Sequence, residues 1–152
     1  MLKKKVLILG ASSDIGIDLV KIFLKNKWQV HAHYNQNKTK LFKIKSKKEN
    51  LKLFKINFFE NLNFIDQEIT NLQFEKYNSY INLIGALDSK SFNESTYNDQ
   101  IKILNANTLY PLHILKKIIP FMMKNKFGRI LNCSSIGVKF GGGRNNYNYS
   151  LS

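Results

Sequence analysis

Glycines and serines at one junction of the sequence form its clearest chemical pattern. Gly10-Ala-Ser-Ser-Asp-Ile-Gly16 stands where the apolar run 6–9 gives way to apolar residues at helical spacing. Glycines let backbone approach a pyrophosphate, and the start of a helix adds free N–H groups and the positive end of its dipole. Ser12 and Ser13 add hydroxyl donors. The junction therefore predicts a phosphate site, although any tight strand-to-helix turn favours Gly and Ser, and Asp14 could be only the N-cap.

The elements that would position this turn alternate between apolar strands and amphipathic helices. We predict strands at residues 6–9, 29–34, 51–57, 80–84 and 129–133. We predict helices from residue 15 to about residue 27, weakly over 62–72, and as one long stripe over 101–122 that Pro111 should kink. Residues 137–148, rich in Gly and Asn, predict a loop. Such alternation is typical of βαβ units around a parallel sheet, so it predicts an α/β fold.

Length and composition predict a single globular domain over residues 1–152. Hydrophobic residues make up 43 % of the 152 residues, which is enough for a packed core. The net charge of +14 invites a nucleic-acid hypothesis, but lysine supplies nearly all of the positive charge, and Arg129 and Arg144 are the only arginines. Proteins that bind bases and phosphates generally use arginine for these contacts. We therefore expect a solvated lysine-rich face and no nucleic-acid partner.

Apolar runs and metal-ligand residue types point to no other class. No apolar run approaches the roughly 20 residues of a membrane span, and no leader ends in a small-residue cleavage site, so we expect a cytoplasmic protein without a membrane partner. The single cysteine, Cys133, has no disulfide partner. His31, His33 and His113 have no third ligand at metal spacing, and we interpret them as structural or surface residues with no metal site.

At the glycine turn the sequence resembles the short-chain dehydrogenase/reductase family, whose fingerprint there is TGxxxGxG. Gly10 and Gly16 match, Leu9 replaces the threonine, and Asp14 replaces the middle glycine. Asn82-Leu-Ile-Gly85 partly matches the NNAG element that follows the family's fourth strand. The resemblance covers nearly the whole chain. It implies a Rossmann-like, doubly wound parallel sheet of about five strands in the order 3-2-1-4-5, with the family's C-terminal strands missing.

The resemblance implies three catalytic residues, Asn107, Ser135 and Tyr149. Asn107 aligns with the asparagine whose backbone holds a water in a proton relay and kinks its helix. Residues 128–135 resemble the element GxIxNxSS, with Ser135 as the catalytic serine, and residues 149–152 resemble the start of YxxxK. In these roles Ser135 would hydrogen-bond the carbonyl oxygen of the substrate, and Tyr149 would be the general acid for its reduction.

Tyr147 is the rival for the tyrosine role. The family's usual gap of thirteen residues after the serine would fall on Asn148, so choosing Tyr149 means that the Gly-rich loop carries one extra residue. Tyr147 would put Leu151 in the place of the family's lysine, whereas Tyr149 puts the lysine directly after Ser152. We therefore choose Tyr149. We also expect these 152 residues alone to lack useful turnover, because the lysine is not among them.

The resemblance also implies a nicotinamide dinucleotide cofactor and hydride transfer to or from a small-molecule carbonyl or alcohol substrate. We expect NADP(H) over NAD(H), because Ala32-His-Tyr-Asn-Gln-Asn37 has no acid to hold a ribose 2′-hydroxyl or to repel a 2′-phosphate. Asn57 stands where the family has an acid or amide against the adenine. The expected cofactor contacts are Gly10, Ser12, Ser13, Asp14, Ile15, Gly16, Tyr34, Asn35, Asn57, Phe58, Asn82 and Gly85.

The substrate itself stays open, with a 3-oxoacyl thioester as one candidate, and we expect the full-length protein to be a homo-oligomer. The alternative is a non-catalytic nucleotide-binding or interaction protein on the same fold, because a fold does not fix a function. The missing lysine favours this alternative for these residues. The joint presence of Asn107, Ser135 and Tyr149 favours an enzyme.

Overall fold

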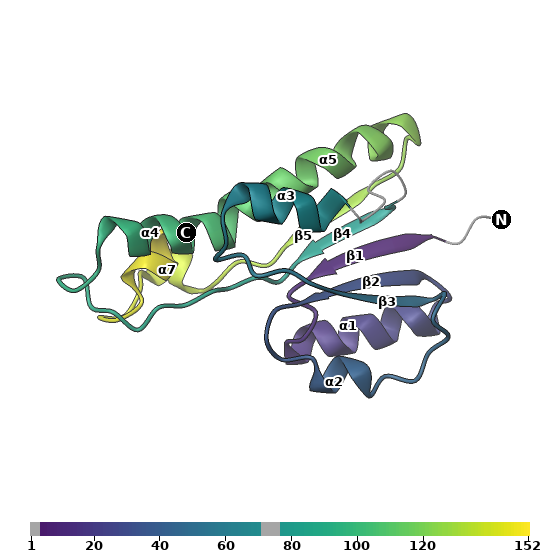
Figure 1. The fold of residues 1–152 in the computed structure, drawn as a ribbon, viewed down its shortest axis with the longest axis horizontal. Helices are drawn as coiled ribbons and strands as arrows, with labels where there is room; N and C mark the ends of the chain where they lie inside the picture. The colour runs from purple at the N-terminus through teal and green to yellow at the C-terminus, as the bar shows by residue number, and fades with distance from the viewer. Residues whose placement is uncertain (1–3, 71–76) are drawn as a thin grey trace.

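Five parallel strands form the centre of the molecule in the computed structural model, which describes residues 4–70 and 77–152 (Figure 1). The strands are β1 (Lys5–Leu9), β2 (Gln29–Tyr34), β3 (Leu51–Lys55), β4 (Ser79–Asn82) and β5 (Arg129–Asn132). They lie in the order β3-β2-β1-β4-β5, and every neighbouring pair is parallel. The predicted α/β fold and strand order are confirmed. β2 and β3 lie on one side of β1, and β4 and β5 lie on the other, so the strand order reverses at β1. In folds of this kind, ligands bind at the carboxyl edge of the sheet near this switch point.

Helices cover both faces of the sheet (Figure 1). They are α1 (Asp14–Lys25), α2 (Thr39–Phe42), α3 (Leu62–Thr70), α4 (Tyr97–Leu104), the π-helical turn η2 (Asn105–Leu109), α5 (Tyr110–Lys124), α6 (Gly137–Phe140) and α7 (Tyr147–Leu151). α1 and α2 lie against one face, and α3 and α5 lie against the other. α4 continues the line of α5 past the carboxyl ends of the strands, where it lies next to α7. Within residues 4–70 and 77–152, none of the helices combines the length and the apolar character that a membrane crossing requires.

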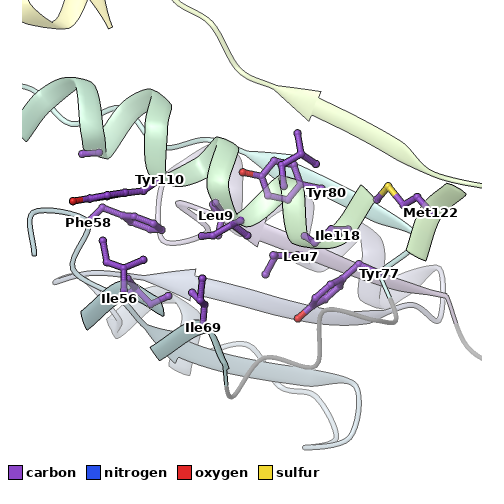
Figure 2. Close-up of a cluster of buried hydrophobic side chains, with 14 residues drawn as sticks. Leu7, Leu9, Ile56, Phe58, Ile69, Tyr77, Tyr80, Tyr110, Ile118 and Met122 are labelled. Carbon is purple, nitrogen blue, oxygen red and sulfur yellow. The ribbon is translucent and has the colours of Figure 1, made fainter. Parts of the chain in front are cut away.

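The central strand β1 separates two hydrophobic cores. Val6 and Ile8 belong to the cluster on the α1 side, whereas Leu7 and Leu9 belong to the cluster beneath α3 and α5. Figure 2 shows Leu7 and Leu9 in the second cluster, below Tyr80 and the helix above it. All four apolar side chains of β1 have no exposed surface. Because side chains alternate between the faces of a strand, one continuous apolar run supplies both cores.

The helix predicted over 101–122 is interrupted by the π-helical turn η2. The N–H of Tyr110 donates to the carbonyl of Asn105, five residues earlier. Pro111 has no N–H, so the carbonyl of Asn107, four residues before it, loses its helical partner. The predicted distortion is therefore present, and it begins one turn before the proline. Single π-turns of this kind are frequent at functional sites.

Two strands are shorter than the sequence predicts, because an asparagine side chain terminates each of them. β3 stops at Lys55 instead of residue 57, and the Oδ1 of Asn57 accepts the N–H of Phe59 at 3.2 Å. β4 stops at Asn82 instead of residue 84, and the Oδ1 of Asn82 accepts the N–H of Ile84 at 3.1 Å. An asparagine that bonds the backbone two residues on makes a turn, which competes with strand pairing.

Short helices occupy segments that the sequence predicts as connections. α2 lies in the lysine-rich connection after β2, where Leu41 is fully buried against the α1 side of the sheet. The prediction of a loop over residues 137–148 is wrong in part, because this segment contains α6 and the start of α7. Helices of four or five residues are too short to show a periodicity. The helix predicted over 62–72 is present as α3 from Leu62 to Thr70, and residues 71 and 72 lie outside the described residues.

Candidate active site

Two glycines make a tight turn between β1 and α1. Gly10 has a φ of +69°, and a Cβ atom there would lie 2.8 Å from the carbonyl oxygen of Leu83. A Cβ atom on Gly16 would lie 2.7 Å from backbone atoms of Ala11. Contacts this short leave no room for a side chain at either position. The turn therefore presents bare backbone at the carboxyl end of β1, next to the segment that follows β4.

Ser13, and not Asp14, is the N-cap of α1. The Oγ of Ser13 accepts the N–H of Gly16 at 3.1 Å and donates to the carbonyl of Gly10 at 2.9 Å. Helix geometry leaves the N–H groups of Asp14 and Ile15 without an intrahelical acceptor. These two groups lie at the positive end of the helix dipole, where an anion can bind them.

The carboxylate of Asp14 is paired with the ammonium group of Lys40 in α2. The hydrogen bond and the charge of Lys40 lower the pKa of the Asp14 carboxyl below its usual range. Both side chains are exposed, as is Ile15, whereas Ser12 is half-buried in the same turn. The lysine thus compensates the negative charge that Asp14 adds at the start of the helix.

His33 lies beneath the glycine turn with 3 % of its surface exposed. Its Nδ1 accepts the N–H of Gly10 at 3.0 Å, and its Nε2 lies 2.9 Å from the carbonyl oxygen of Ile56. Burial lowers the pKa of the imidazole to about 4. Sequence reasoning left His33 out of the site because Gly10 is 23 residues away along the chain. The available signal was a histidine next to the last residue of the predicted strand 29–34, close to the edge of the sheet that carries the site.

Four further predicted cofactor contacts, Tyr34, Asn35, Asn57 and Phe58, lie at the ends of β2 and β3. The Nδ2 of Asn35 donates to the Oδ1 of Asn57 at 3.3 Å and joins the two strand ends. The ring of Tyr34 packs edge-on against Phe42 of α2. Phe58 is a core residue with 4 % exposure, so only its backbone remains for contact with a ligand.

A cavity of about 290 Å³ opens at the carboxyl ends of β4 and β5. It brings together the three residues predicted to be catalytic: Asn107 from η2, Ser135 from the segment after β5, and Tyr149 from α7. Asn82 at the end of β4 lines the same cavity, and apolar side chains of α5 form its opposite wall. Hydroxyl and amide groups therefore converge in a pocket with one apolar side.

Tyr147, the rival tyrosine, lines a different hollow. Its ring packs edge-on against Phe92, with 4.6 Å between the ring centroids. Because residues two apart on a helix point in different directions, α7 cannot present both tyrosines to one cavity. The geometry places Tyr149 in the cavity that Ser135 lines.

The side chain of Asn107 hydrogen-bonds two other segments that surround the cavity. Its Oδ1 accepts the N–H of Ala86 at 2.7 Å, and its Nδ2 donates to the carbonyl of Ala86 at 3.0 Å. The Nδ2 also donates to the hydroxyl of Ser152 at 2.7 Å. One side chain therefore ties η2 both to the segment after β4 and to the end of α7.

The hydroxyls of Ser135 and Tyr149 belong to short segments on either side of the Gly-rich loop. The Oγ of Ser135 accepts the N–H of Gly137 at 3.2 Å. A Cβ atom on Gly85 would lie 3.6 Å from the hydroxyl of Tyr149, so this ring lies along the segment after β4. The tyrosine hydroxyl and the backbone at position 85 are therefore close neighbours.

Asn148 anchors α7 next to Tyr149. Its side chain is buried, and its Nδ2 donates to the Oδ2 of Asp88 at 2.6 Å and to the hydroxyl of Ser95 at 2.7 Å. Asp88 and Ser95 both belong to the connection between β4 and α4. A long connection and a short helix are therefore held together through one amide.

The glycine turn and the cavity adjoin at the segment after β4. A Cβ atom on Gly10 would lie 3.2 Å from the backbone nitrogen of Ile84, and Ile84 also lines the cavity. An extended ligand with a phosphate at the turn can therefore reach the cavity with its other end. In residues 4–70 and 77–152, no group of three or more His, Cys, Asp or Glu side chains is placed to hold a metal ion.

Several solved structures have the same fold. One is a 4-hydroxyisoleucine dehydrogenase complexed with NADH, with a TM-score of 0.82 and 23 % identity over 98 % of this chain and 61 % of that one. A short-chain dehydrogenase from Streptomyces avermitilis has a TM-score of 0.82 and 16 % identity over 99 % of this chain and 55 % of that one. A variant of actinorhodin polyketide ketoreductase with NADPH has a TM-score of 0.80 and 17 % identity over 98 % of this chain and 59 % of that one. The chain thus spans less than two thirds of the length of these three structures.

Sequence comparison is consistent with this likeness of fold. No curated protein matches the chain. The short chain dehydrogenase family, in contrast, matches residues 4–152, which is nearly the whole chain. The glycine turn, the sheet order and the family match agree, and the chain belongs to the short chain dehydrogenase family.

Proposed function

We propose that this chain binds a nicotinamide dinucleotide along the carboxyl edge of its sheet, as part of an oxidoreductase that moves hydride to or from a small carbonyl or alcohol substrate. The observation that carries the proposal is the cavity in which Asn107, Ser135 and Tyr149 meet from three separate elements. Among the similar structures, one is complexed with NADH and one with NADPH, which supports a nicotinamide cofactor.

The residues of the glycine turn fit the diphosphate of such a cofactor. A Cβ atom at Gly10 or Gly16 would lie within 3 Å of backbone atoms, so neither position can carry a side chain. The turn before α1 therefore exposes its backbone to a ligand. The N–H groups of Asp14 and Ile15 point out of the helix start and would bind the phosphate oxygens. The hydroxyl of Ser12 adds a donor beside them.

The cavity residues would act on the carbonyl or alcohol group. The cofactor supplies or accepts the hydride. Ser135 would donate a hydrogen bond to the substrate oxygen, and Tyr149 would give that oxygen a proton during reduction. Asn107 would keep α7 in place through its bond to Ser152. The apolar wall from α5 would limit the access of water to the reacting carbon.

We propose NADP(H) as the preferred cofactor, with NAD(H) as the alternative. β2 ends at Tyr34, and the residues after it carry amides and positive charge and no acid as far as Lys40. An acid at this strand end would hold a ribose 2′-hydroxyl and repel a 2′-phosphate. Asn35, whose side chain donates to Asn57, and Lys38, whose ammonium group lies over the ring of Phe42, supply donors after this strand end.

The 152 residues do not include the lysine that the family resemblance places four residues after Tyr149. We therefore propose that they bind cofactor with little turnover, and that turnover belongs to a longer, homo-oligomeric protein. A 3-oxoacyl thioester is one candidate substrate, since a polyketide ketoreductase is among the similar structures. A nucleotide-binding protein without catalysis is the second candidate function, because the same fold can bind a dinucleotide without carrying out a reaction.

Tyr149→Phe and the matched control Tyr147→Phe test the proposal. Both substitutions should be made in the protein that is translated as far as the stop codon. NADPH oxidation is then measured with a panel of carbonyl compounds. We expect Tyr149→Phe to lower kcat by about 10²- to 10⁴-fold while the Kd for NADPH stays unchanged, because only the proton donor is lost. Tyr147→Phe should behave like the wild type.

Two outcomes would contradict the proposal in different ways. Activity that survives Tyr149→Phe and disappears in Tyr147→Phe would assign the proton donor to Tyr147. Cofactor binding without turnover on any carbonyl compound would favour the non-catalytic alternative.

A further inference from the structure

The proton positions on His33 follow from its two hydrogen-bond partners. An amide N–H can only donate, so Nδ1, which lies 3.0 Å from the nitrogen of Gly10, must carry a lone pair. A carbonyl oxygen can only accept, so Nε2, which lies 2.9 Å from the oxygen of Ile56, must carry the proton. The geometry therefore permits one neutral tautomer. A proton on Nδ1 would face the N–H of Gly10 and break the contact.

The residue at position 33 serves two successive amides of the turn. The backbone carbonyl of His33 accepts the N–H of Ala11 at 2.9 Å, while its ring accepts the N–H of Gly10. The first of these bonds continues the pairing of β1 with β2 and is available to any residue. The second depends on the side chain, and it reaches the one glycine of the turn that has a positive φ.

The ring is also fixed on its remaining sides. It packs against Phe54 and Phe58, with centroid distances of 5.5 and 4.9 Å. Ile56 and Phe58 flank Asn57, which stands at the end of the site opposite to the cavity. A single buried imidazole thus connects the turn after β1 with the end of β3.

From these contacts we propose that His33 is a positioning residue of the cofactor site, whose ring acceptor holds the Gly10 amide and thereby sets the direction of the turn that receives the diphosphate. This inference rests on the proposed cofactor binding and goes beyond it, because it gives a role to a side chain that does not touch the ligand. The N–H of Gly10 is withheld from the ligand, and the N–H groups of Asp14 and Ile15 at the start of α1 remain for the diphosphate. Loss of the acceptor frees the turn to rotate its amides away.

Two substitutions separate the two hydrogen bonds of the ring. His33→Asn places an amide oxygen near the position of Nδ1 and keeps an acceptor for Gly10, but it is too short to reach Ile56. His33→Gln places an amide nitrogen near the position of Nε2 and keeps a donor for Ile56, but it leaves the N–H of Gly10 without its acceptor. Each variant loses one buried hydrogen bond and part of the ring, so the two should be destabilised by similar amounts.

Cofactor affinity distinguishes a positioning role from a structural one. Titration of NADPH into the 152-residue chain should give a Kd raised about tenfold in His33→Gln, where the N–H of Gly10 has lost its acceptor, and within about threefold of the wild type in His33→Asn, where an acceptor is kept. Adenosine 2′-monophosphate, which has no diphosphate, should bind both variants equally. Equal loss of NADPH affinity in the two variants, or equal loss of both ligands, would overturn the inference and leave the proposed function standing.

A measurement on the wild-type chain covers the case in which a variant does not fold. The ¹⁵N chemical shifts of the His33 ring should show an unprotonated Nδ1 and a protonated Nε2 at neutral pH, with a scalar coupling between Nδ1 and the N–H of Gly10. A ring that exchanges between tautomers, or one protonated on Nδ1, would overturn the inference directly. A wild-type chain that binds neither NADPH nor NADH would overturn the proposed cofactor binding and this inference with it.

Discussion

The glycine turn and the wall of the cavity that carries Ser135 are built in opposite ways. The turn follows β1, whose apolar residues have no exposed surface, and its closest contacts are with backbone. Ser135 follows β5, the edge strand, where Ile130 is 47 % exposed and Leu131 is 49 % exposed. The turn thus rests directly on the core through Gly10, Ala11 and Gly16, whereas the serine and the tyrosine stand on segments outside the core.

This difference separates the residues that hold the fold from those proposed to do chemistry. α7 carries Tyr149, and side-chain hydrogen bonds from Asn148, Thr108 and Asn107 join α7 and Ser152 to distant parts of the chain. Substitutions in the turn should therefore change stability and cofactor binding together. Substitutions in the cavity wall should change turnover while the free energy of unfolding stays nearly constant, as is usual for reactive groups on loops above a rigid scaffold.

Gly16→Ala should give the largest effect on the turn side, and Gly143→Ala is its matched control in the Gly-rich loop. The added Cβ would lie 2.7 Å from the backbone of Ala11, whereas nothing lies within 4 Å of a Cβ on Gly143. We expect Gly16→Ala to lower the free energy of unfolding by about 3 kcal/mol or more and to weaken NADPH binding at least about 100-fold. Gly143→Ala should change stability by less than about 0.5 kcal/mol. Urea unfolding and NADPH titration measure both, and similar results for the two variants would remove the contrast between the regions.

Acid should destabilise the turn side through His33. Burial lowers its pKa from 6.5 to about 4 in the folded chain, so the unfolded chain binds a proton in this pH window that the folded chain does not. Stability is then complete above about pH 6.5 and falls as the pH drops toward 4, by at most about 3 kcal/mol for this residue. Urea unfolding at a series of pH values, followed by the fluorescence of Trp28, measures the slope. His33→Asn has no group that titrates at this position and should give a flatter profile, whereas parallel profiles would show that His33 contributes nothing to acid sensitivity.

The arrangement of the sheet could be predicted from the sequence because it depends on pattern. Alternating apolar runs and helical stripes suffice for a parallel sheet, and a glycine turn after the first strand marks the switch point. Strand ends could not be placed because Asn57 and Asn82 end their strands through their own side chains. The alternative role of Asp14 as the N-cap is excluded for a similar reason, since both Ser13 and Asp14 are suitable caps and only the folded geometry selects Ser13.

The site was predictable only where its parts are local or carry a family motif. The sequence pointed to Tyr149 over Tyr147 by register, and the catalytic role of Tyr149 remains a prediction that the proposed assay tests. No local pattern connects His33 with Gly10 or Asn148 with Asp88, because these pairs form only when distant segments fold together. The charge of Lys40 beside Asp14 was hidden in the same way, since periodicity gives no sign of the four-residue helix α2 that carries it.

The smallest expected effect concerns the pair formed by Asp14 and Lys40 at the start of α1. Both side chains are exposed, so the pair should matter little for folding, but it lies where the diphosphate is proposed to bind. Lys40→Ala leaves the carboxylate uncompensated and should raise the Kd for NADPH about threefold, whereas Asp14→Asn frees the ammonium group and should lower the Kd about threefold. NADPH titrations of both single variants and the double variant, at low and at high salt, test this as a double-mutant cycle. The two effects should be opposite in sign, should not add in the double variant, and should shrink at high salt because exposed charges are screened. Effects that persist at high salt would mean that Asp14 acts through the shape of the turn and not through its charge.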